Sequence, residues 1–146
     1  MTVIAWDGNC LAADKCAISG GGITRSITKI WAHKDVLYGI TGDWDIAAEM
    51  REWHKVGALP REFPPSARDA KATLIVVTKN GVLHYVSGPY PLLIESKKCA
   101  FGSGRDYAEA TMYLGYSAVV AVQTASFFQS DCGNGVDVLR LTNWRG

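Results

Sequence analysis

Segments that read as β-strands are grouped in this sequence and do not alternate with helices. Four of them precede the first helical pattern, at residues 2–6, 10–18, 27–32 and 36–41. Others follow at residues 73–78, 82–86, 98–101 and 136–141. Because a doubly wound parallel sheet needs strands and helices in alternation, this grouping predicts a layered α+β fold instead. The length of 146 residues fits one domain, which we expect to span residues 1–146.

Three helices are predicted between these strands. The first starts at Asp43, a good N-cap, and has apolar residues at three- and four-residue spacing. The second covers residues 105–114, directly after the Gly-Ser-Gly motif at 102–104. The third covers residues 117–128 and is almost entirely apolar, which predicts a buried helix. Three prolines within residues 57–70 indicate a surface loop.

Composition excludes several classes of protein. Fifteen basic and fourteen acidic residues leave a formal net charge of +1 without a basic cluster, which argues against nucleic-acid binding. No apolar stretch approaches the ~20 residues that a membrane-spanning helix needs. The first ten residues lack the features of a secretory signal, so we expect a cytoplasmic protein with reduced cysteines. The cysteine and histidine spacings match no metal motif, and we predict neither a metal nor a cofactor.

Familiar catalytic motifs are missing from the sequence. The glycines at 20–22 are not followed by the Gly-Lys-Ser/Thr of a P-loop, and no GxGxxG occurs between a strand and a helix. Ser103 has glycines on both sides but does not stand in a GxSxG motif. No histidine occupies a recognisable catalytic motif either. If the chain is an enzyme, we therefore expect a base other than histidine.

Thr2 can supply a nucleophile and a base from one residue. It follows Met1, and its small side chain favours removal of that methionine. While Met1 is present, the nitrogen of Thr2 is locked in a peptide bond. A free α-amine has a pKa near ~7.7–8.0, so a terminal Thr2 would carry a partly deprotonated amine beside its own hydroxyl. Many proteins begin with Met-Thr, so the support for this role has to come from other residues.

Asp14 and Lys29 are the residues that provide this support. Asp14 follows apolar residues in a predicted strand, where an unpaired buried carboxylate would be costly. Lys29 lies in another strand-like stretch. Together they can form a buried ion pair near Thr2, and a positive charge there would favour the deprotonated amine and hydroxyl. The alternative is that Lys29 points to solvent from one face of its strand.

Six motifs then occur in the order of a known family. They are Thr2-Val-Ile-Ala-Trp-Asp-Gly, Leu11-Ala-Ala-Asp14, Thr28-Lys29-Ile30, Tyr38-Gly39-Ile-Thr-Gly42-Asp43, Gly102-Ser103-Gly104-x-x-Tyr107-Ala108 and Gly133-Asn-Gly135-Val-Asp137-Val138. With these motifs the chain resembles the proteasome β-subunit superfamily of N-terminal-nucleophile hydrolases, most of all its short bacterial and phage members. The resemblance spans nearly the whole chain and implies a four-layer αββα sandwich of two antiparallel sheets.

The resemblance also implies a role for each matched residue. Thr2 matches the terminal nucleophile, Lys29 the catalytic lysine, and Asp14 the aspartate that orients this lysine. Gly39 matches the glycine whose backbone N–H donates to the oxyanion. Ser103 matches the serine that helps to move the proton of the terminal amine. Structural alternatives exist for two of them, since Ser103 can cap the following helix and Gly39 can be required by close strand packing alone.

Three positions depart from the pattern of the family. Gln129 stands where many active members have an aspartate, Cys132 replaces a serine, and Ile18 lies where a threonine commonly lines the substrate strand. Gln129 supplies no charge to fix Ser103, and the thiol of Cys132 is a poor hydrogen-bond donor. These departures argue against efficient catalysis.

The first function implied by the resemblance is a threonine-type amide hydrolase that acts on peptides or proteins. The family relationship implies a homo-oligomer, a ring or stacked ring, and an ATP-dependent unfoldase as a partner. With 146 residues, the chain is shorter than typical ring-forming relatives. Two alternatives stay open: a small-molecule amidase or acyltransferase with the same nucleophile, and a non-catalytic scaffold in which Asp14 and Lys29 form a structural ion pair.

Overall fold

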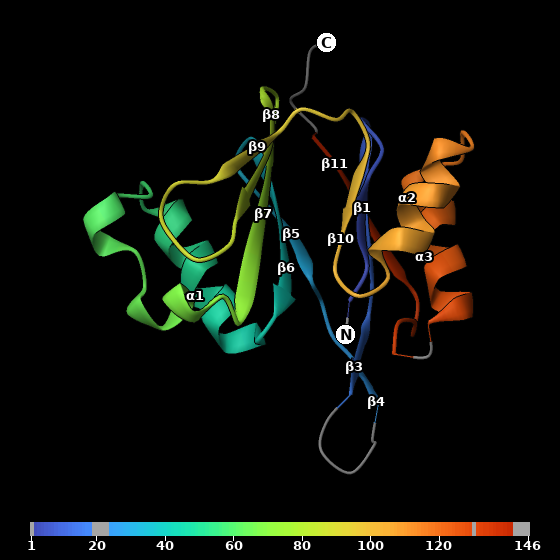
Figure 1. Cartoon of the computed structure of the whole chain (residues 1–146), viewed down its shortest axis with the longest axis horizontal. Helices are drawn as coiled ribbons and strands as arrows, with labels where there is room; N and C mark the ends of the chain where they lie inside the picture. The colour runs from blue at the N-terminus through green and yellow to red at the C-terminus, as the bar shows by residue number, and fades with distance from the viewer. Residues whose placement is uncertain (1, 19–23, 130, 142–146) are drawn as a thin grey trace.

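The chain folds into four layers in the order helix, sheet, sheet, helix (Figure 1). The computed structural model describes residues 2–18, 24–129 and 131–141. The strands are β1 (Ile4–Trp6), β2 (Cys10–Asp14), β3 (Cys16–Ile18), β4 (Thr24–Ser26), β5 (Ile30–His33), β6 (Val36–Gly42), β7 (Ala72–Thr78), β8 (Gly81–Tyr85), β9 (Leu92–Ile94), β10 (Cys99–Phe101) and β11 (Val136–Arg140). The helices are α1 (Trp44–Lys55), α2 (Arg105–Tyr113) and α3 (Ala118–Phe128), with the short 3-10 helices η1 (Pro60–Glu62) and η2 (Pro65–Asp69). The predicted α+β class and αββα layering are confirmed.

The described strands pair into three antiparallel sheets, where two were predicted. One large sheet has the order β10-β1-β2-β11, and the other has the order β5-β6-β7-β8-β9. β3 and β4 form a small sheet of their own. This third sheet arises because the predicted strand at 10–18 breaks at Lys15, whose N–H donates to Gly133 O at 2.8 Å. The break separates β2 from β3 and frees β3 to pair with β4.

Local sequence signals explain where α1 and α3 begin and why some short elements were not predicted. Asp43 caps α1 by accepting hydrogen bonds from two backbone N–H groups of its first turn, and Ser117 caps α3 in the same way with one. The prolines of residues 57–70 open η1 and η2 inside the predicted loop. Strands β4 and β9 were not predicted, since β4 is an exposed, polar Thr-Arg-Ser segment and β9 directly follows Pro91 in the predicted loop. The glycines at 20–22 lie outside the described residues.

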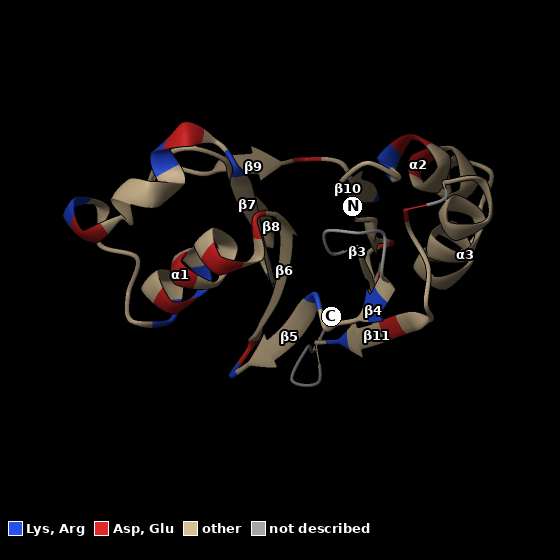
Figure 2. Cartoon of the chain, turned by 90° about the horizontal axis from the view of Figure 1, so that it is seen from below, with Lys and Arg blue, Asp and Glu red and all other residues tan. Residues whose placement is uncertain are grey.

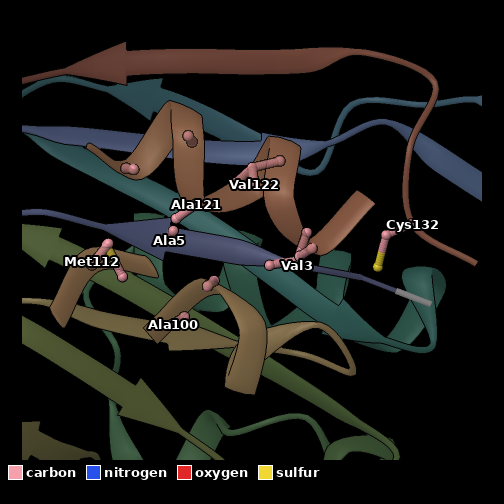
Figure 3. Close-up of a cluster of buried hydrophobic side chains, with 11 residues drawn as sticks. Val3, Ala5, Ala100, Met112, Ala121, Val122 and Cys132 are labelled. Carbon is pink, nitrogen blue, oxygen red and sulfur yellow. The ribbon is translucent and has the colours of Figure 1, made fainter. Parts of the chain in front are cut away.

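Three hydrophobic clusters fill the spaces between the layers. Between the two large sheets lie Ile4, Trp6, Leu11, Ala13, Ile30, Leu37, Ile75, Val77, Val82, Cys99 and Phe101. Beneath α1 lie Tyr38, Ile40, Ala47, Met50, Trp53, Phe63, Ala67, Ala72, Leu74, Val76 and Tyr85. Beneath α2 and α3 lie Val3, Ala5, Ala12, Ala100, Ala108, Met112, Ala118, Ala121, Val122, Ala125 and Cys132 (Figure 3). The last cluster contains no aromatic ring, so α2 and α3 pack on their sheet through small side chains.

Helix α3 is buried on one face only. Ala118, Ala121, Val122 and Ala125 point into the core, whereas Phe127 is 82% exposed. The prediction of a buried helix is therefore wrong for its outer face, because among the described residues no further layer covers α2 and α3 from outside (Figure 1). Within the described ranges, neither α3 nor another helix combines the length and apolarity needed to cross a membrane.

Candidate active site

Thr2 lies buried at the start of β1, against the loop that leads into α2. Gly104 N–H donates to Thr2 O at 3.1 Å. A Cβ atom on Gly102 would lie 2.2 Å from Thr2 O, and Gly102 has a φ of +96°. Only glycine meets both conditions. The first glycine of the Gly-Ser-Gly motif thus lets the loop approach the backbone of Thr2.

Ser103 contacts Thr2 through its side chain. Thr2 N–H donates to Ser103 Oγ at 3.3 Å, and the Ser103 hydroxyl lies 3.4 Å from Thr2 O. The N-cap of α2 is Gly104, without any side-chain capping bond. The alternative in which Ser103 caps this helix is therefore wrong. Its hydroxyl lies instead within hydrogen-bond distance of the nitrogen that removal of Met1 would turn into an amine.

Asp14 and Lys29 form the buried ion pair that the sequence suggested. Asp14 is fully buried and Lys29 is 3% exposed. Lys29 Nζ lies 2.9 Å from Asp14 Oδ1 and 3.1 Å from Oδ2. The alternative in which Lys29 points to solvent is excluded. Burying two charges is expensive, and such a pair persists only when further hydrogen bonds satisfy it.

Backbone N–H groups provide these further hydrogen bonds to Asp14. Its Oδ1 accepts from Val3 N–H at 3.0 Å, and its Oδ2 accepts from Gly133 N–H at 3.0 Å and Cys16 N–H at 3.2 Å. Oδ1 thus binds both the Lys29 ammonium and the Val3 amide, the peptide group that joins Val3 to Thr2. The ammonium is held within two hydrogen-bond lengths of that amide. Asp14 therefore ties the charge of Lys29 to the start of β1.

Gly39 does not have the geometry of an oxyanion donor. Ile40 N–H donates to Lys29 O at 3.1 Å, so the backbone of Ile40 faces β5. Successive residues of a strand point their N–H groups to opposite sides, so Gly39 N–H faces β7, where Ile75 is its partner. A Cβ on Gly39 would lie 3.0 Å from a terminal methyl group of Ile4. This favours the structural alternative, in which Gly39 permits close packing of the two sheets.

Gly42, in the same motif, has the geometry that Gly39 lacks. It lies two residues beyond Ile40, so its N–H faces the same side of β6 as that of Ile40. The residue that would face it in a longer β5–β6 ladder is Ile27, whose N–H donates instead to Lys15 O at 2.8 Å. The φ of Gly42 is +82°, which glycine tolerates best. The register of β6 thus favours Gly42 over Gly39 as a candidate donor, and the two glycines stand three residues apart in one motif.

The structure brings one of the three departing residues into the site. Burial, aided by the nearby Asp14 carboxylate, raises the pKa of Cys132 to about 11, while a hydrogen bond with Ser103 opposes this rise. The thiol is therefore neutral at pH 7 and lies beside Ser103. Gln129 is the C-cap of α3, and Ile18 lies at the end of β3 with 47% of its surface exposed.

The described side chains were expected to form no metal site. In that part of the chain, His, Cys, Asp and Glu do not gather into a group of three or more that could hold a metal ion. His54 belongs to the last turn of α1, where its Nδ1 is 2.6 Å from the hydroxyl of Tyr38. The groups that meet just before β1 are thus a hydroxyl, an ion pair and the backbone amides that hold Asp14, an arrangement that can support proton transfer.

The same fold occurs in solved structures. The chain is similar to Thiobacillus denitrificans BPH in complex with epoxomicin, with a TM-score of 0.69, 22% identity, and coverage of 97% of this chain and 100% of that chain. For a second structure of Thiobacillus denitrificans BPH, the TM-score is 0.66, the identity 22%, and the coverage 99% and 100%. For eukaryotic HslV from Trypanosoma brucei they are 0.70, 22%, 94% and 97%.

Sequence comparison finds no relative, whereas structure comparison does. No family model matches the sequence, and the search of curated proteins finds no match. BPH and HslV are N-terminal-nucleophile hydrolases of the proteasome family. An identity of 22% establishes a common fold and leaves the activity to be tested. With its αββα layers and near-complete coverage, this chain has the fold of the proteasome β-subunit superfamily, as its six motifs predicted.

Proposed function

We propose that the chain is a threonine-type peptide hydrolase whose nucleophile is Thr2 after removal of Met1. The observation that carries this proposal is the double use of Asp14 Oδ1, which binds both the Lys29 ammonium and the Val3 amide next to Thr2. A pair kept only for stability could be replaced by packed apolar residues at little cost. This pair is instead bonded to the residue that follows the proposed nucleophile.

The first half of the reaction cleaves the amide. The charge of Lys29 favours the neutral form of the freed Thr2 amine. This amine takes the hydroxyl proton while Thr2 Oγ bonds to the substrate carbonyl carbon. The same proton then passes to the leaving nitrogen as the C–N bond breaks, and an ester between substrate and Thr2 remains. Ser103 Oγ, which lies 3.3 Å from the Thr2 nitrogen, would orient the amine for both transfers.

The second half hydrolyses the ester. The Thr2 amine takes a proton from water, the resulting hydroxide bonds to the ester carbon, and the C–Oγ bond breaks. The proton returns to Thr2 Oγ, which restores the enzyme. In both halves the carbonyl oxygen becomes negative, and we assign Gly42 N–H as its donor. Such a donor typically stabilises a transition state by ~2.7–4 kcal/mol.

The first test measures the N-terminus and the turnover of peptides together. Mass spectrometry of the chain from its own cells should show loss of Met1. Thr2→Ala should lower peptide turnover by roughly 10³-fold or more, and Thr2→Ser should retain part of it. Thr124→Ala is the matched control, since the hydroxyl of Thr124 donates to Val120 O within α3. A retained Met1, or equal turnover by Thr2→Ala, would leave the scaffold as the better description.

A second test separates peptides from small amides. The processed chain should cleave peptides faster than small-molecule amides, and the opposite preference would identify an amidase. Epoxomicin, the ligand in one of the BPH structures, supplies a binding probe. The processed chain should bind it, and Thr2→Ala should bind it less tightly. Equal binding by both variants would contradict the role of Thr2.

A further inference from the structure

A cavity lies between the two short 3-10 helices and the loop that joins β8 to β9. Its volume is about 760 Å³, and pockets for small molecules usually measure ~300–1,000 Å³. Its wall includes Arg61 of η1, Arg68 of η2, His84 of β8, Tyr90 of the loop and Leu92 of β9, and we call it the β8–β9 cavity. It shares no lining residue with the candidate active site.

The wall of the β8–β9 cavity is positively charged. Arg61 and Arg68 are both exposed, and the lining residues include no Asp or Glu. The ion pairs among the described residues involve neither guanidinium, although Glu62 and Asp69 directly follow these arginines in sequence. Strand β9, which contributes Leu92, carries no charge, as Figure 2 shows. An anion in the cavity would therefore meet two positive charges and no negative charge in its wall.

A ring contact holds Arg68 in place without neutralising it. Its guanidinium carbon lies 5.4 Å from the centre of the Phe63 ring, and Phe63 is buried in the core beneath α1. A guanidinium that lies over an aromatic face keeps the N–H groups at its edge for another partner. Its planar fork can donate two parallel hydrogen bonds to the oxygen atoms of a phosphate or a carboxylate. Arg68 is thus oriented by one partner, while its charge stays unpaired among the described residues.

His84 carries the one buried side-chain nitrogen or oxygen atom without a hydrogen-bond partner among the described residues, its Nε2. The ring packs on Phe101 with centroids 4.7 Å apart. Burial lowers the pKa of His84, so the ring is neutral at pH 7 and can donate from Nε2. An unpaired buried polar atom costs stability, and each one in a native chain calls for an explanation. A polar ligand that displaces the side chains covering the ring would supply the missing partner.

The same wall also exposes apolar surface. Tyr90 is 78% exposed and Leu92 is 59% exposed. A bare phosphate ion would leave both side chains in water, whereas a ligand with a ring would stack on Tyr90 and contact Leu92. A phosphate monoester carries a charge of about −1.5 to −2 at pH 7, which balances two arginines, and a carboxylate balances only one. The lining therefore favours a ligand that combines a ring with a phosphate group.

We propose that the β8–β9 cavity binds a small molecule that carries a phosphate monoester on a ring. Arg61 and Arg68 bind the phosphate oxygen atoms, and His84 donates to one of them from Nε2. Tyr90 and Leu92 contact the ring. Binding at this cavity needs no processed N-terminus, so its failure can be told from the failure of the proposed peptide hydrolysis.

Calorimetric titration of the full chain with three probes tests the class of ligand. Phenyl phosphate has both the ring and the double charge, inorganic phosphate lacks the ring, and benzoate lacks the second charge. Phenyl phosphate should bind at least ~10-fold more tightly than either of the others, and added salt should weaken its binding. Equally tight binding of benzoate would contradict a phosphate site, and equally tight binding of inorganic phosphate would contradict a role for the ring. No binding of phenyl phosphate at millimolar concentration would overturn the proposal.

Variants of the two arginines test where phenyl phosphate binds. Arg61→Gln and Arg68→Gln should each weaken its binding at least ~10-fold, because each removes a charged hydrogen bond. Arg25→Gln is the matched control, since Arg25 is also an exposed arginine but lies in β4. It should leave the affinity unchanged. Equal losses in all three variants would mean attraction to net charge only and would overturn the proposed site. Circular dichroism should show that the three variants remain folded.

His84→Phe separates a binding role of His84 from a structural one. It keeps a ring beside Phe101 and removes the unpaired nitrogen. The midpoint of thermal unfolding should therefore stay the same or rise, while phenyl phosphate should bind ~10-fold more weakly. A lower midpoint with unchanged affinity would make His84 a structural residue and contradict its place in the site. A phosphotyrosine peptide that binds more tightly than phenyl phosphate would identify a protein as the ligand and also overturn the proposal.

Discussion

The two halves of the sandwich place their aromatic residues in opposite ways. Beneath α1 the core is built from Tyr38, Trp53, Phe63 and Tyr85, while Glu52 forms ion pairs with neighbouring residues on the outer side of this helix. Beneath α2 and α3 the core is mostly alanine and valine, and the aromatic rings lie outside. The α1 half thus keeps its aromatic residues in the core and presents charged residues to water. The α2–α3 half has a core of small side chains and carries its aromatic rings on the outside.

The core of small side chains also explains why the candidate site lies in the α2–α3 half. Small side chains let α2 and α3 approach the sheet closely, and this brings the loop at 102–104 onto Thr2. Gly104 shows how closely the start of α2 packs on Val3, since a Cβ there would lie 2.9 Å from Val3 Cβ. Four predictions test this difference between the two halves, each by comparing variants of the chain. The largest expected effect comes first.

Asp14→Asn should be the most damaging single change. It removes the charge that compensates Lys29 inside the protein, and breaking a buried pair typically costs about 3–5 kcal/mol. The matched control is Asp137→Asn, which breaks the more exposed pair of Asp137 with Lys15 and should cost about 1 kcal/mol or less. Urea unfolding gives both values. Similar losses for the two variants would mean that burial does not set the importance of the Asp14–Lys29 pair.

Trp53→Ala should destabilise the α1 half by about 3–5 kcal/mol, as large-to-small changes of buried aromatic residues do. Trp53 is 5% exposed and touches Phe63 and Tyr85 edge to face. Peptide turnover at a temperature where the variant is folded should be unchanged. Trp44→Ala, at a half-exposed position of the same helix, should cost much less. A loss of turnover in folded Trp53→Ala would contradict the separation of stability and chemistry between the halves.

Gly104→Ala should destabilise by about 1–3 kcal/mol, the usual cost of overpacking a core. The new methyl group would also meet Ala125 Cβ at 3.1 Å, so neither side can yield without moving a helix or β1. Because β1 starts next to Thr2, turnover should fall as well. Gly88→Ala is the control in the other half, where a Cβ has no neighbour within 4 Å. Thermal unfolding that is equally perturbed by both would show that the α2–α3 half is not tightly packed.

The smallest effect concerns the pH dependence of the α1 half. Burial lowers the pKa of His54, so the folded chain holds this proton less tightly than the unfolded chain. Stability should therefore be full above the unfolded pKa of about 6.5 and should fall as the pH drops from there toward the folded pKa.

His84 is also partly buried and its pKa is lowered in the same way, so a variant is needed to isolate His54. His54→Gln should reduce the slope of unfolding free energy against pH between about pH 5 and pH 7. Urea unfolding across this range gives the slope. If the slope is unchanged in His54→Gln, another group causes the pH dependence of stability. A slope of opposite sign would contradict a partly buried, neutral His54 in the folded chain.

The order of elements and the buried Asp14–Lys29 pair could be predicted because each depends on local signals, whereas the place of Ser103 beside Thr2 followed from the resemblance alone. Capping residues, apolar spacing and turn glycines mark the helices and hairpins where they stand. A carboxylate after an apolar run implies a buried partner wherever the fold places it. Six motifs in order then determine how these elements combine.

The direction of the backbone N–H groups and the burial of helix faces, by contrast, were decided only by the tertiary structure. Gly39 and Gly42 share one motif, and the pairing of β6 with β5 and β7 determines which N–H leaves the sheet. The apolar sequence of α3 predicted burial, yet a helix is buried only on faces that another layer covers, and the chain supplies a layer for one face. The sequence by itself thus determined which groups meet at Thr2. Backbone orientation and layer coverage depend on contacts between distant segments, and these exist only in the folded chain.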